Sequence, residues 1–150
     1  MSKIKYFFLI VITLLCTATT LSSCSKDDND DEEYSIPTST SFYVGTWSVQ
    51  SVEGWGLVVN DGFEYIQLKA DGTCIDVSDD EDEPKGYSVE YGTWTVANGK
   101  LIIKMTSSEL AGTTITYDIT KAETNKLTVS VWGITAYLTK VSDSVIEKYL

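Results

Sequence analysis

The 150-residue chain contains no histidine, and this absence limits the chemistry that its side chains can perform. Histidine-based general-base catalysis, Ser-His-Asp or Cys-His nucleophilic chemistry and histidine-ligated zinc are all excluded. Any catalysis or metal binding would therefore have to rest on carboxylates.

The densest group of carboxylates is formed by Asp76, Asp79, Asp80, Glu81, Asp82 and Glu83. Such oxygens can coordinate a hard cation such as calcium, but this run lacks the ordered spacing and the turn glycine of an EF-hand. Glycoside hydrolysis needs two rigidly opposed carboxylates, which a flexible loop does not provide. We therefore expect no metal site, no cofactor and no enzymatic activity.

Cys24 is the residue whose neighbours indicate a covalent modification. An apolar run of about ten residues, Tyr6 to Leu15, has the length of a secretory signal and falls short of the roughly 18 to 20 residues that cross a bilayer. The Leu-Ser-Ser-Cys that ends at Cys24 resembles the bacterial lipobox. This resemblance implies that residues 1–23 are a lipoprotein signal peptide and that acyl chains such as palmitate on Cys24 anchor the protein in a membrane. The alternative is an ordinary cleaved signal followed by an incidental cysteine.

Residues 24–41 form a polar segment that we expect to act as a flexible tether. Six carboxylates lie between Asp27 and Glu33, and like charges without apolar neighbours cannot form a folded core. The segment also resembles the acidic export signal of surface-displayed lipoproteins in Gram-negative gut anaerobes. This resemblance implies an outer-membrane lipoprotein on the cell surface. The alternative is a solvated tether on the periplasmic face.

The composition argues against a nucleic-acid partner. The chain has 22 acidic residues against 11 basic ones, and all 11 are lysine. Such a surface repels phosphate backbones and offers no arginine for bidentate phosphate contacts. We expect a monomer whose partners are the membrane, through Cys24, and a small apolar ligand. Cys74 has no disulfide partner once the signal is removed, so we expect it to be a small buried side chain.

The folded domain is expected at residues 42–141, followed by a short helix at 142–150. Residues 42–141 are rich in Val, Ile, Thr, Tyr and Trp. Helical periodicity occurs only in the last ten residues of the chain. Asp71-Gly72 and Asn98-Gly99 predict two-residue hairpin turns, because these residues tolerate positive φ. The sequence predicts eight strands: Tyr43 to Val52, Phe63 to Ala70, Thr73 to Val77, Tyr87 to Ala97, Lys100 to Thr106, Thr113 to Thr120, Lys126 to Val131 and Ile134 to Lys140.

Alternation of apolar and polar side chains indicates that one face of this sheet is buried. It is clearest in the strands that carry Leu101, Ile103 and Met105; Ile115, Tyr117 and Ile119; and Leu127, Val129 and Val131. Short connections join antiparallel neighbours, and a meander of eight strands removes its edges by closing into an up-and-down barrel. An open sheet or a two-sheet sandwich is the alternative. The strand from Phe63 has large apolar side chains on both faces, so its inward face is not assigned.

Three short motifs give the domain a family resemblance. Gly45-Thr46-Trp47 opens the first strand, Asp71-Gly72-Thr73 forms a turn, and Gly92-Thr93-Trp94 precedes a hairpin. Their order and spacing resemble the lipocalin-like domain of bacterial lipoproteins. The resemblance implies that Trp47 lies at the closed end of the barrel and that Trp94 has a related packing role. The chain offers no arginine to cap Trp47, and a shared fold does not identify a ligand.

Four side chains are candidates for ligand contact. Trp55 lies between two glycines and Trp132 precedes another, and exposed aromatic rings can stack on sugars or line an apolar site. Met105 and Tyr117 are expected to border a pocket inside the barrel, unless side chains fill the interior. The alternative for each residue is core or cross-strand packing.

These observations support two functional interpretations. The first is a non-catalytic, lipid-anchored binding protein that holds a small apolar or amphipathic ligand in or at the mouth of the barrel. The second is a surface-displayed accessory module that contacts a glycan or a partner protein through aromatics such as Trp55 and Trp132. The exposure of these two rings bears on the second interpretation.

Overall fold

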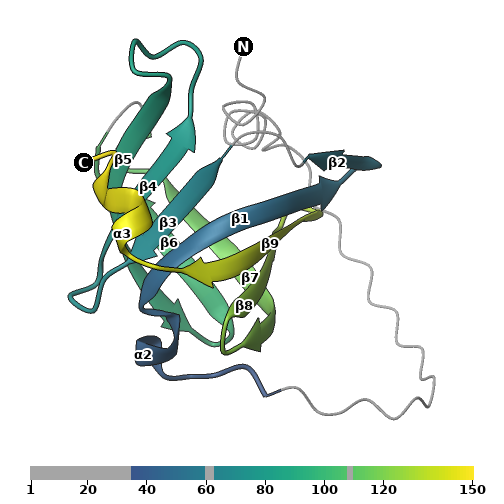
Figure 1. Ribbon diagram of the computed structural model, residues 1–150. Helices are drawn as coiled ribbons and strands as arrows, with labels where there is room; N and C mark the ends of the chain where they lie inside the picture. The colour runs from purple at the N-terminus through teal and green to yellow at the C-terminus, as the bar shows by residue number, and fades with distance from the viewer. Residues whose placement is uncertain (1–34, 60–62, 108–109) are drawn as a thin grey trace.

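The computed structural model is a single antiparallel sheet that closes on itself (Figure 1). It describes residues 35–59, 63–107 and 110–150. The elements in chain order are α2 (Thr40–Tyr43), β1 (Gly45–Gly54), β2 (Leu57–Val59), β3 (Glu64–Leu68), β4 (Thr73–Asp79), β5 (Tyr87–Ala97), β6 (Lys100–Met105), β7 (Thr114–Glu123), β8 (Lys126–Val131), β9 (Ile134–Val141) and α3 (Ser144–Glu147).

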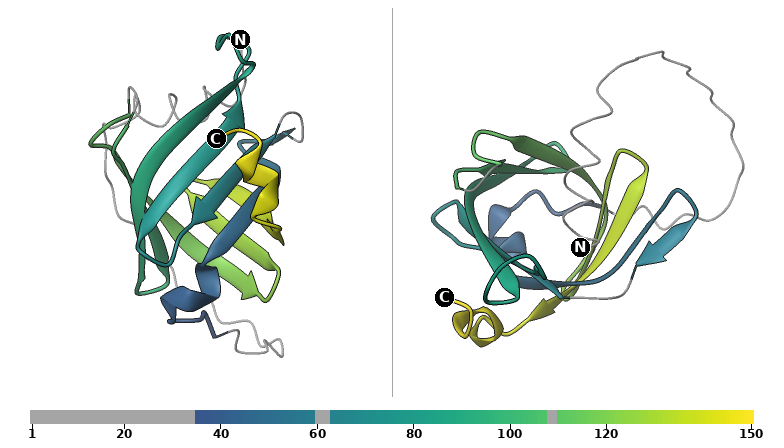
Figure 2. Two further views of the ribbon diagram at one scale, coloured as in Figure 1. Left: turned by 60° about the vertical axis from the view of Figure 1, so that its left-hand side comes forward. Right: turned by 90° about the horizontal axis from the view of Figure 1, so that it is seen from above.

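The ring consists of eight strands, β1 and β3 to β9, each paired with its neighbour in chain order. β9 returns to pair with β1, from Thr46 opposite Val141 to Gly54 opposite Ile134. A bulge between Val49 and Ser51 interrupts this pairing, and bulges increase the local bend of a strand. Seen from above, the strands encircle one axis (Figure 2). The predicted eight-stranded up-and-down barrel with a short C-terminal helix is confirmed.

Several local predictions need correction. β2 is a ninth, short strand that pairs only with the end of β1, and Tyr43 belongs to α2 rather than to β1. Asn98-Gly99 forms the predicted tight turn, with φ of 52° and 71°. Asp71-Gly72 does not: β3 ends at Leu68, and the backbone N–H of Thr73 donates to Asp71 Oδ1 at 2.9 Å. The aspartate side chain stabilises this longer loop.

Trp47 seals the end of the barrel next to α2. Its side chain is fully buried, and its Nε1–H donates to the Tyr43 carbonyl at 2.8 Å. Lys140 Nζ lies 5.1 Å from the centroid of the Trp47 ring and donates to the Phe42 carbonyl at 3.3 Å. A lysine thus occupies the capping position for which the sequence offers no arginine, and its charge interacts favourably with the ring. Gly45 beside Lys140 has a φ of 129°, a backbone conformation that residues with a side chain rarely adopt, so this position favours glycine.

The segment expected to be a tether joins this closed end before its predicted limit at residue 41. Ile36 packs against the buried core, and the Tyr43 hydroxyl donates to the Pro37 carbonyl at 2.7 Å. The expected signal peptide and Cys24 lie outside the described residues. Within the described ranges, no helix has the length and apolarity needed to span a bilayer.

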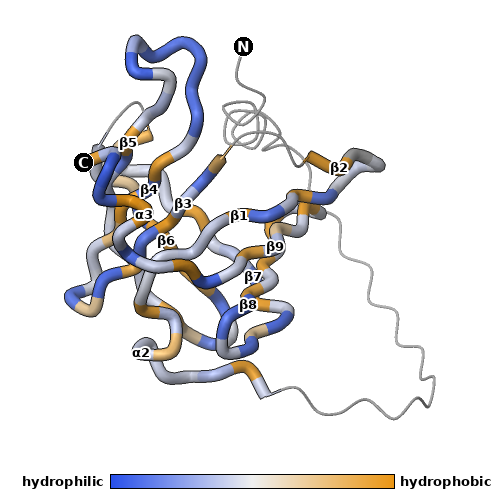
Figure 3. Tube along the Cα trace, in the orientation of Figure 1, coloured by the Kyte–Doolittle hydropathy of each residue, from blue (hydrophilic) through white to orange (hydrophobic). Residues whose placement is uncertain are grey.

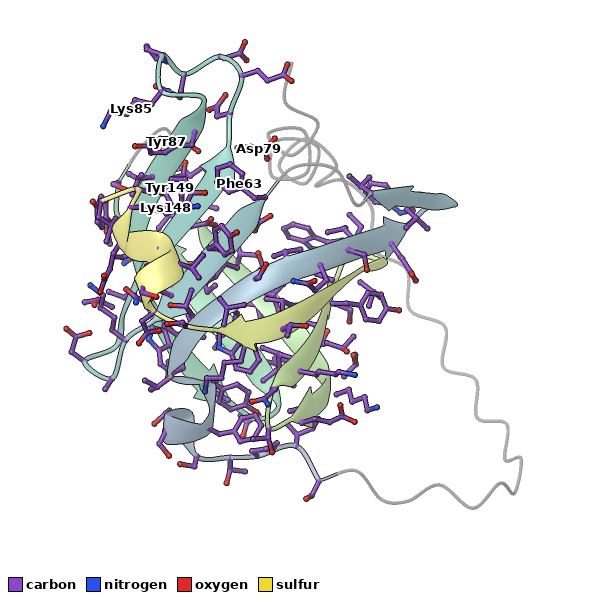
Figure 4. All side chains as sticks on the ribbon, in the orientation of Figure 1. Phe63, Asp79, Lys85, Tyr87, Lys148 and Tyr149 are labelled. Atoms are coloured by element: carbon purple, nitrogen blue, oxygen red, sulfur yellow. The ribbon has the colours of Figure 1, made fainter. Side chains whose placement is uncertain are left out.

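The outer wall of β3, β4 and β5 is covered by α3 and the residues that follow it. Ile146 is buried with Ile75 and Val77, and the Tyr149 ring stacks on Phe63 at 5.0 Å and 21°. Figure 4 shows Phe63, Tyr87 and Tyr149 together on this wall. A covered outer face explains why the strand from Phe63 has apolar side chains on both sides. Glu64, Ile66 and Leu68 face the interior, and Phe63 and Tyr65 face α3.

Replacing Trp47 should lower the stability of the whole barrel. Trp47→Phe removes the donor to the Tyr43 carbonyl and leaves unfilled space, which should cost about 2 to 3 kcal/mol of unfolding free energy. Trp132→Phe, at an exposed tryptophan, should change it by less than about 0.5 kcal/mol. Urea denaturation followed by circular dichroism measures both values. Equal losses in the two variants would contradict the sealing role of Trp47.

Candidate ligand site at the open end of the barrel

The two ends of the barrel are built differently. The closed end carries α2 and the turns after β3, β5 and β7. The open end, defined here by the turns after β1, β4, β6 and β8, lies at the top of Figure 1. The β4–β5 hairpin at this end is strongly hydrophilic (Figure 3).

Three carboxylates face the interior near the open end. Side chains alternate along a strand, and Ile75 and Val77 on β4 and Val89 on β5 pack outward against the α3 cluster. Asp76 lies between Ile75 and Val77, and Glu90 follows Val89, so both point inward. They lie directly opposite each other in the β4–β5 ladder. Glu64 points inward from the start of β3. We call Glu64, Asp76 and Glu90 the carboxylate wall.

The carboxylate wall is partly accessible, whereas the closed end is sealed. Asp76 and Glu90 are half-buried, as are the inward-facing Ser78 and Ser88 further towards the open end. Leu68, inward on β3 at the closed end, is 1% exposed. The inward side chains on the carboxylate side are therefore less buried towards the open end than at the closed end.

Burial and repulsion by neighbouring charges keep Glu64 and Asp76 from ionising readily. Glu64 is 8% exposed, and burial, followed by the charges of Asp79 and Glu90, raises its pKa to about 7. Burial, with the charges of Glu64 and Glu90, raises the pKa of Asp76 well above its ordinary value. The Asp76 Oδ1 atom is buried without a hydrogen-bond partner among the described residues. Such a group is costly unless a ligand compensates for it.

Tyr117 faces the carboxylate wall from the other side of the ring. Its strand, β7, is four positions from β3 in the eight-stranded ring, and its side chain is 7% exposed. Its hydroxyl makes no hydrogen bond within the described part of the chain. Burial, and then the charges of Glu64 and Asp76, raise the pKa of Tyr117 well above its ordinary value, so the phenol remains a neutral donor.

The rest of the interior is apolar. The inward side chains of β6, β7, β8 and β9 are buried and form one continuous core with Trp47 and Trp94: they include Leu101, Ile103, Met105, Ile115, Ile119, Leu127, Val129, Val131 and Leu138. The interior therefore has an acidic, partly accessible wall and a hydrophobic one. An amphipathic small molecule matches this division.

Cys74 and Gly92 lie on the inner face below the carboxylate wall. Burial, and then the charge of Asp76, raises the pKa of the Cys74 thiol to about 11, so it behaves as the small buried side chain that we expected. A Cβ on Gly92 would lie 2.7 Å from the Lys104 carbonyl oxygen and 3.0 Å from Cys74 Sγ. The glycine of the second Gly-Thr-Trp motif thus permits close strand packing. Trp94 in that motif is buried and donates to the Lys69 carbonyl at 2.9 Å.

Trp55 and Trp132 form a separate surface at the rim of the open end. Their rings are 60% and 52% exposed, and each begins a Trp-Gly turn with φ near 50°. The turns are neighbours because Gly54 and Ile134 pair in the β1–β9 ladder. Val58 on β2 and Tyr137 on β9 are also exposed. A bulky side chain at positive φ is unfavourable, so local propensity does not account for tryptophan at these positions.

The structure thus separates the four candidates for ligand contact into two places. Tyr117 and Met105 are buried in the interior, whereas Trp55 and Trp132 lie outside on the rim. The carboxylate wall was missed, because Asp76 was read as part of an acidic loop. Alternation with Ile75 and Val77 alone would place Asp76 on the outer face, and only the packing of Ile75 and Val77 against α3 turns it inward. Among the described residues, no group of three potential ligands is arranged to hold a metal ion.

Comparisons with known proteins agree on the fold. The sequence model of the lipocalin-like domain family matches residues 44–129. A lipocalin-like protein from Bacteroides uniformis has a TM-score of 0.58 at 11% identity, covering 67% of this chain and 99% of that one. An uncharacterized protein from Bacteroides eggerthii has a TM-score of 0.54 at 14% identity, covering 66% and 99%. No curated protein matches the sequence.

The raised pKa of Glu64 predicts a pH dependence of stability. The folded-state pKa of about 7 lies above the ordinary value of 4.5, so the folded protein holds the Glu64 proton more tightly than the unfolded chain does. The stability that comes from this tighter proton binding is complete below pH 4.5 and is lost as the pH rises through 7. Glu64→Gln should therefore match the wild type at pH 4.5 and exceed its unfolding free energy at pH 8 by on the order of 2 to 3 kcal/mol.

Urea denaturation at the two pH values measures this difference. Glu147→Gln, the same change at an exposed position on α3, should leave the wild-type pH dependence intact. An unaltered pH dependence in Glu64→Gln would show that Glu64 ionises as freely as an exposed residue.

Proposed function

Because the chain belongs to the family of lipocalin-like domains, we propose that it is a non-catalytic binding protein that takes a small apolar or amphipathic ligand at the open end of its barrel. The family's domains are generally binding folds, which supports a role without catalysis. The observation that carries the proposal is the division of the interior. One wall is polar and partly accessible, the other is hydrophobic, and Trp47 seals the far end.

An obstruction of the interior should test this proposal. Ser88→Trp places a large side chain on the inner face near the open end, and it should weaken binding of the neutral apolar dye N-phenyl-1-naphthylamine by about tenfold or more. Thr95→Trp adds the same side chain on the outer face of β5 and should leave the affinity unchanged. Dye fluorescence measures affinity, and circular dichroism confirms that both variants fold. Equal affinities in both variants would place the dye outside the barrel.

The rim tryptophans favour a second candidate function, in which the domain is an accessory module that contacts a glycan or a partner protein. Trp55 and Trp132 are the largest exposed aromatic rings, and adjacent exposed rings suit stacking on a sugar or a protein surface. In the dye experiment, Trp55→Ala with Trp132→Ala should leave binding unchanged if the interior is the site. Loss of binding in this double variant, with none in Ser88→Trp, would favour the rim.

The anchor completes the proposal. We expect the protein to be lipidated at Cys24 and attached to the outer membrane, with the acidic tether directing it to the cell surface. The supporting observation is the lipobox-like sequence followed by six carboxylates between Asp27 and Glu33.

Substitution of Cys24 should release the protein from the membrane. Cys24→Ser should abolish labelling by an alkynyl palmitate analogue and move the protein to the soluble fraction, because the thiol carries the anchoring acyl chain. Replacing the six carboxylates by their amides should preserve labelling but reduce digestion by protease added to intact cells. Labelling that persists in Cys24→Ser would contradict lipidation at this residue.

A further inference from the structure

The described side chains place no positive charge beside Glu64 and Asp76 in the carboxylate wall. Glu64 and Asp76 project inward from adjacent strands, and Glu90 lies directly opposite Asp76. The described lysines lie elsewhere. Lys69, Lys85, Lys104, Lys121, Lys126 and Lys148 are exposed, Lys100 pairs with Asp118, and Lys140 is held at the closed end.

Two further observations indicate that the wall is arranged for a bound molecule. Tyr117, which is 7% exposed as a residue, faces the wall from β7, and its hydroxyl makes no hydrogen bond to another described residue. Glu64 is also more than nine-tenths buried, and no hydrogen bond joins its carboxylate to another described residue. Buried polar groups in a stable interior normally have partners. These groups are therefore available to a ligand that supplies positive charge and an acceptor or an electron-poor surface.

We propose that the carboxylate wall binds the ammonium group of a cationic amphipathic small molecule, whose apolar part lies against the hydrophobic wall formed by β6 to β9. This inference rests on the ligand-binding function proposed above and names the chemical class of that ligand. Glu64 and Asp76 supply the charge, and the Tyr117 ring and its hydroxyl oxygen face the ammonium from the opposite side. Attraction between a cation and a tyrosine ring adds to the ionic contact.

The geometry favours an organic cation over a metal ion. Cross-strand partners such as Asp76 and Glu90 have Cβ atoms about 4.5 to 5.5 Å apart, and Glu64 lies one strand further along. Calcium needs six or more oxygens at about 2.3 to 2.6 Å. Among the described residues no such group of ligands converges. An ammonium group with attached carbon is larger and is satisfied by carboxylates spread over several strands.

The bound cation should also change the protonation of the wall. Glu64 has a pKa of about 7 without ligand, so a cation must displace its proton at lower pH and binds more tightly once it is ionised. The titratable groups that face it are Asp76, Asp79, Glu90, Cys74 and Tyr117. Burial raises the pKa of Cys74 and of Tyr117, so these two remain neutral in this range. Affinity for a cation of fixed charge should therefore rise between pH 5.5 and pH 8.

Calorimetric titration with three ligands of equal chain length tests the proposal. Decyltrimethylammonium should bind the purified protein at pH 8 at least about tenfold more tightly than decanol or decanoate, because only the first pairs with the wall. Glu64→Gln with Asp76→Asn should lower the affinity for decyltrimethylammonium by about tenfold or more and leave decanol binding unchanged. Retained decanol binding also shows that this variant is folded.

Control variants separate the wall from the general acidity of the protein. Asp82→Asn with Glu147→Gln removes two exposed carboxylates and should leave the affinity for decyltrimethylammonium within about twofold of the wild type. The increase in affinity from pH 5.5 to pH 8 should be lost in Glu64→Gln with Asp76→Asn and kept in Glu147→Gln.

The outcomes distinguish failure of this inference from failure of the proposed function. If decanol binds as tightly as decyltrimethylammonium, the barrel is an apolar site and the ammonium assignment is wrong. If calcium chloride displaces decyltrimethylammonium from the wild type at matched concentrations but not from the double variant, the wall is a metal site. If none of the three ligands binds the folded protein, both proposals fail.

Discussion

Pairing of β9 with β1 is the interaction on which the rest of the structure depends. It turns an open meander into a ring, and among the described strands only the short β2 is left as an edge. It also brings β7 opposite β3, so that Tyr117 can face Glu64 across the interior. In an open sheet these two strands would be separated by the widths of three others. The candidate site therefore exists only because the sheet closes.

A barrel with carboxylates inside it is less stable than one with an apolar interior, so other parts must offset their burial. The hydrophobic wall of β6 to β9 and the sealed end around Trp47 bury most of the core. On the outside, α3 covers β3, β4 and β5, the three strands that carry the carboxylates. β3, β4 and β5 thus gain apolar packing on their outer face, and this packing offsets the polar side chains on their inner face. Such a compromise between stability and a polar interior is typical of functional sites.

Two structural features follow from contacts that no local pattern reveals. The lysine over Trp47 comes from the last strand, 93 positions later in the chain, and becomes visible only when β9 pairs with β1. The Trp-Gly turns contain no Asn or Asp to mark a hairpin, so the β1–β2 turn was not predicted, although Asn98-Gly99 was. The register of Gly54 against Ile134 then places the two tryptophans together at the rim.

The sequence by itself determined the strand order, the closed barrel and the buried face of the later strands, because alternation and short turns are local properties. The packing roles of Trp47 and Trp94 were implied by the resemblance to lipocalin-like domains. Tertiary structure alone decided the inward face of β3 and β4. Both faces of β3 carry some apolar side chains. Side chains alternate between the two faces of a strand, but this alternation does not show which face is inside until one face is seen to be covered. Packing of α3 on Ile75 and Val77 covers the outer one. That contact, between segments about 70 residues apart, turns Glu64 and Asp76 into the barrel and makes an acidic stretch of sequence a candidate binding wall.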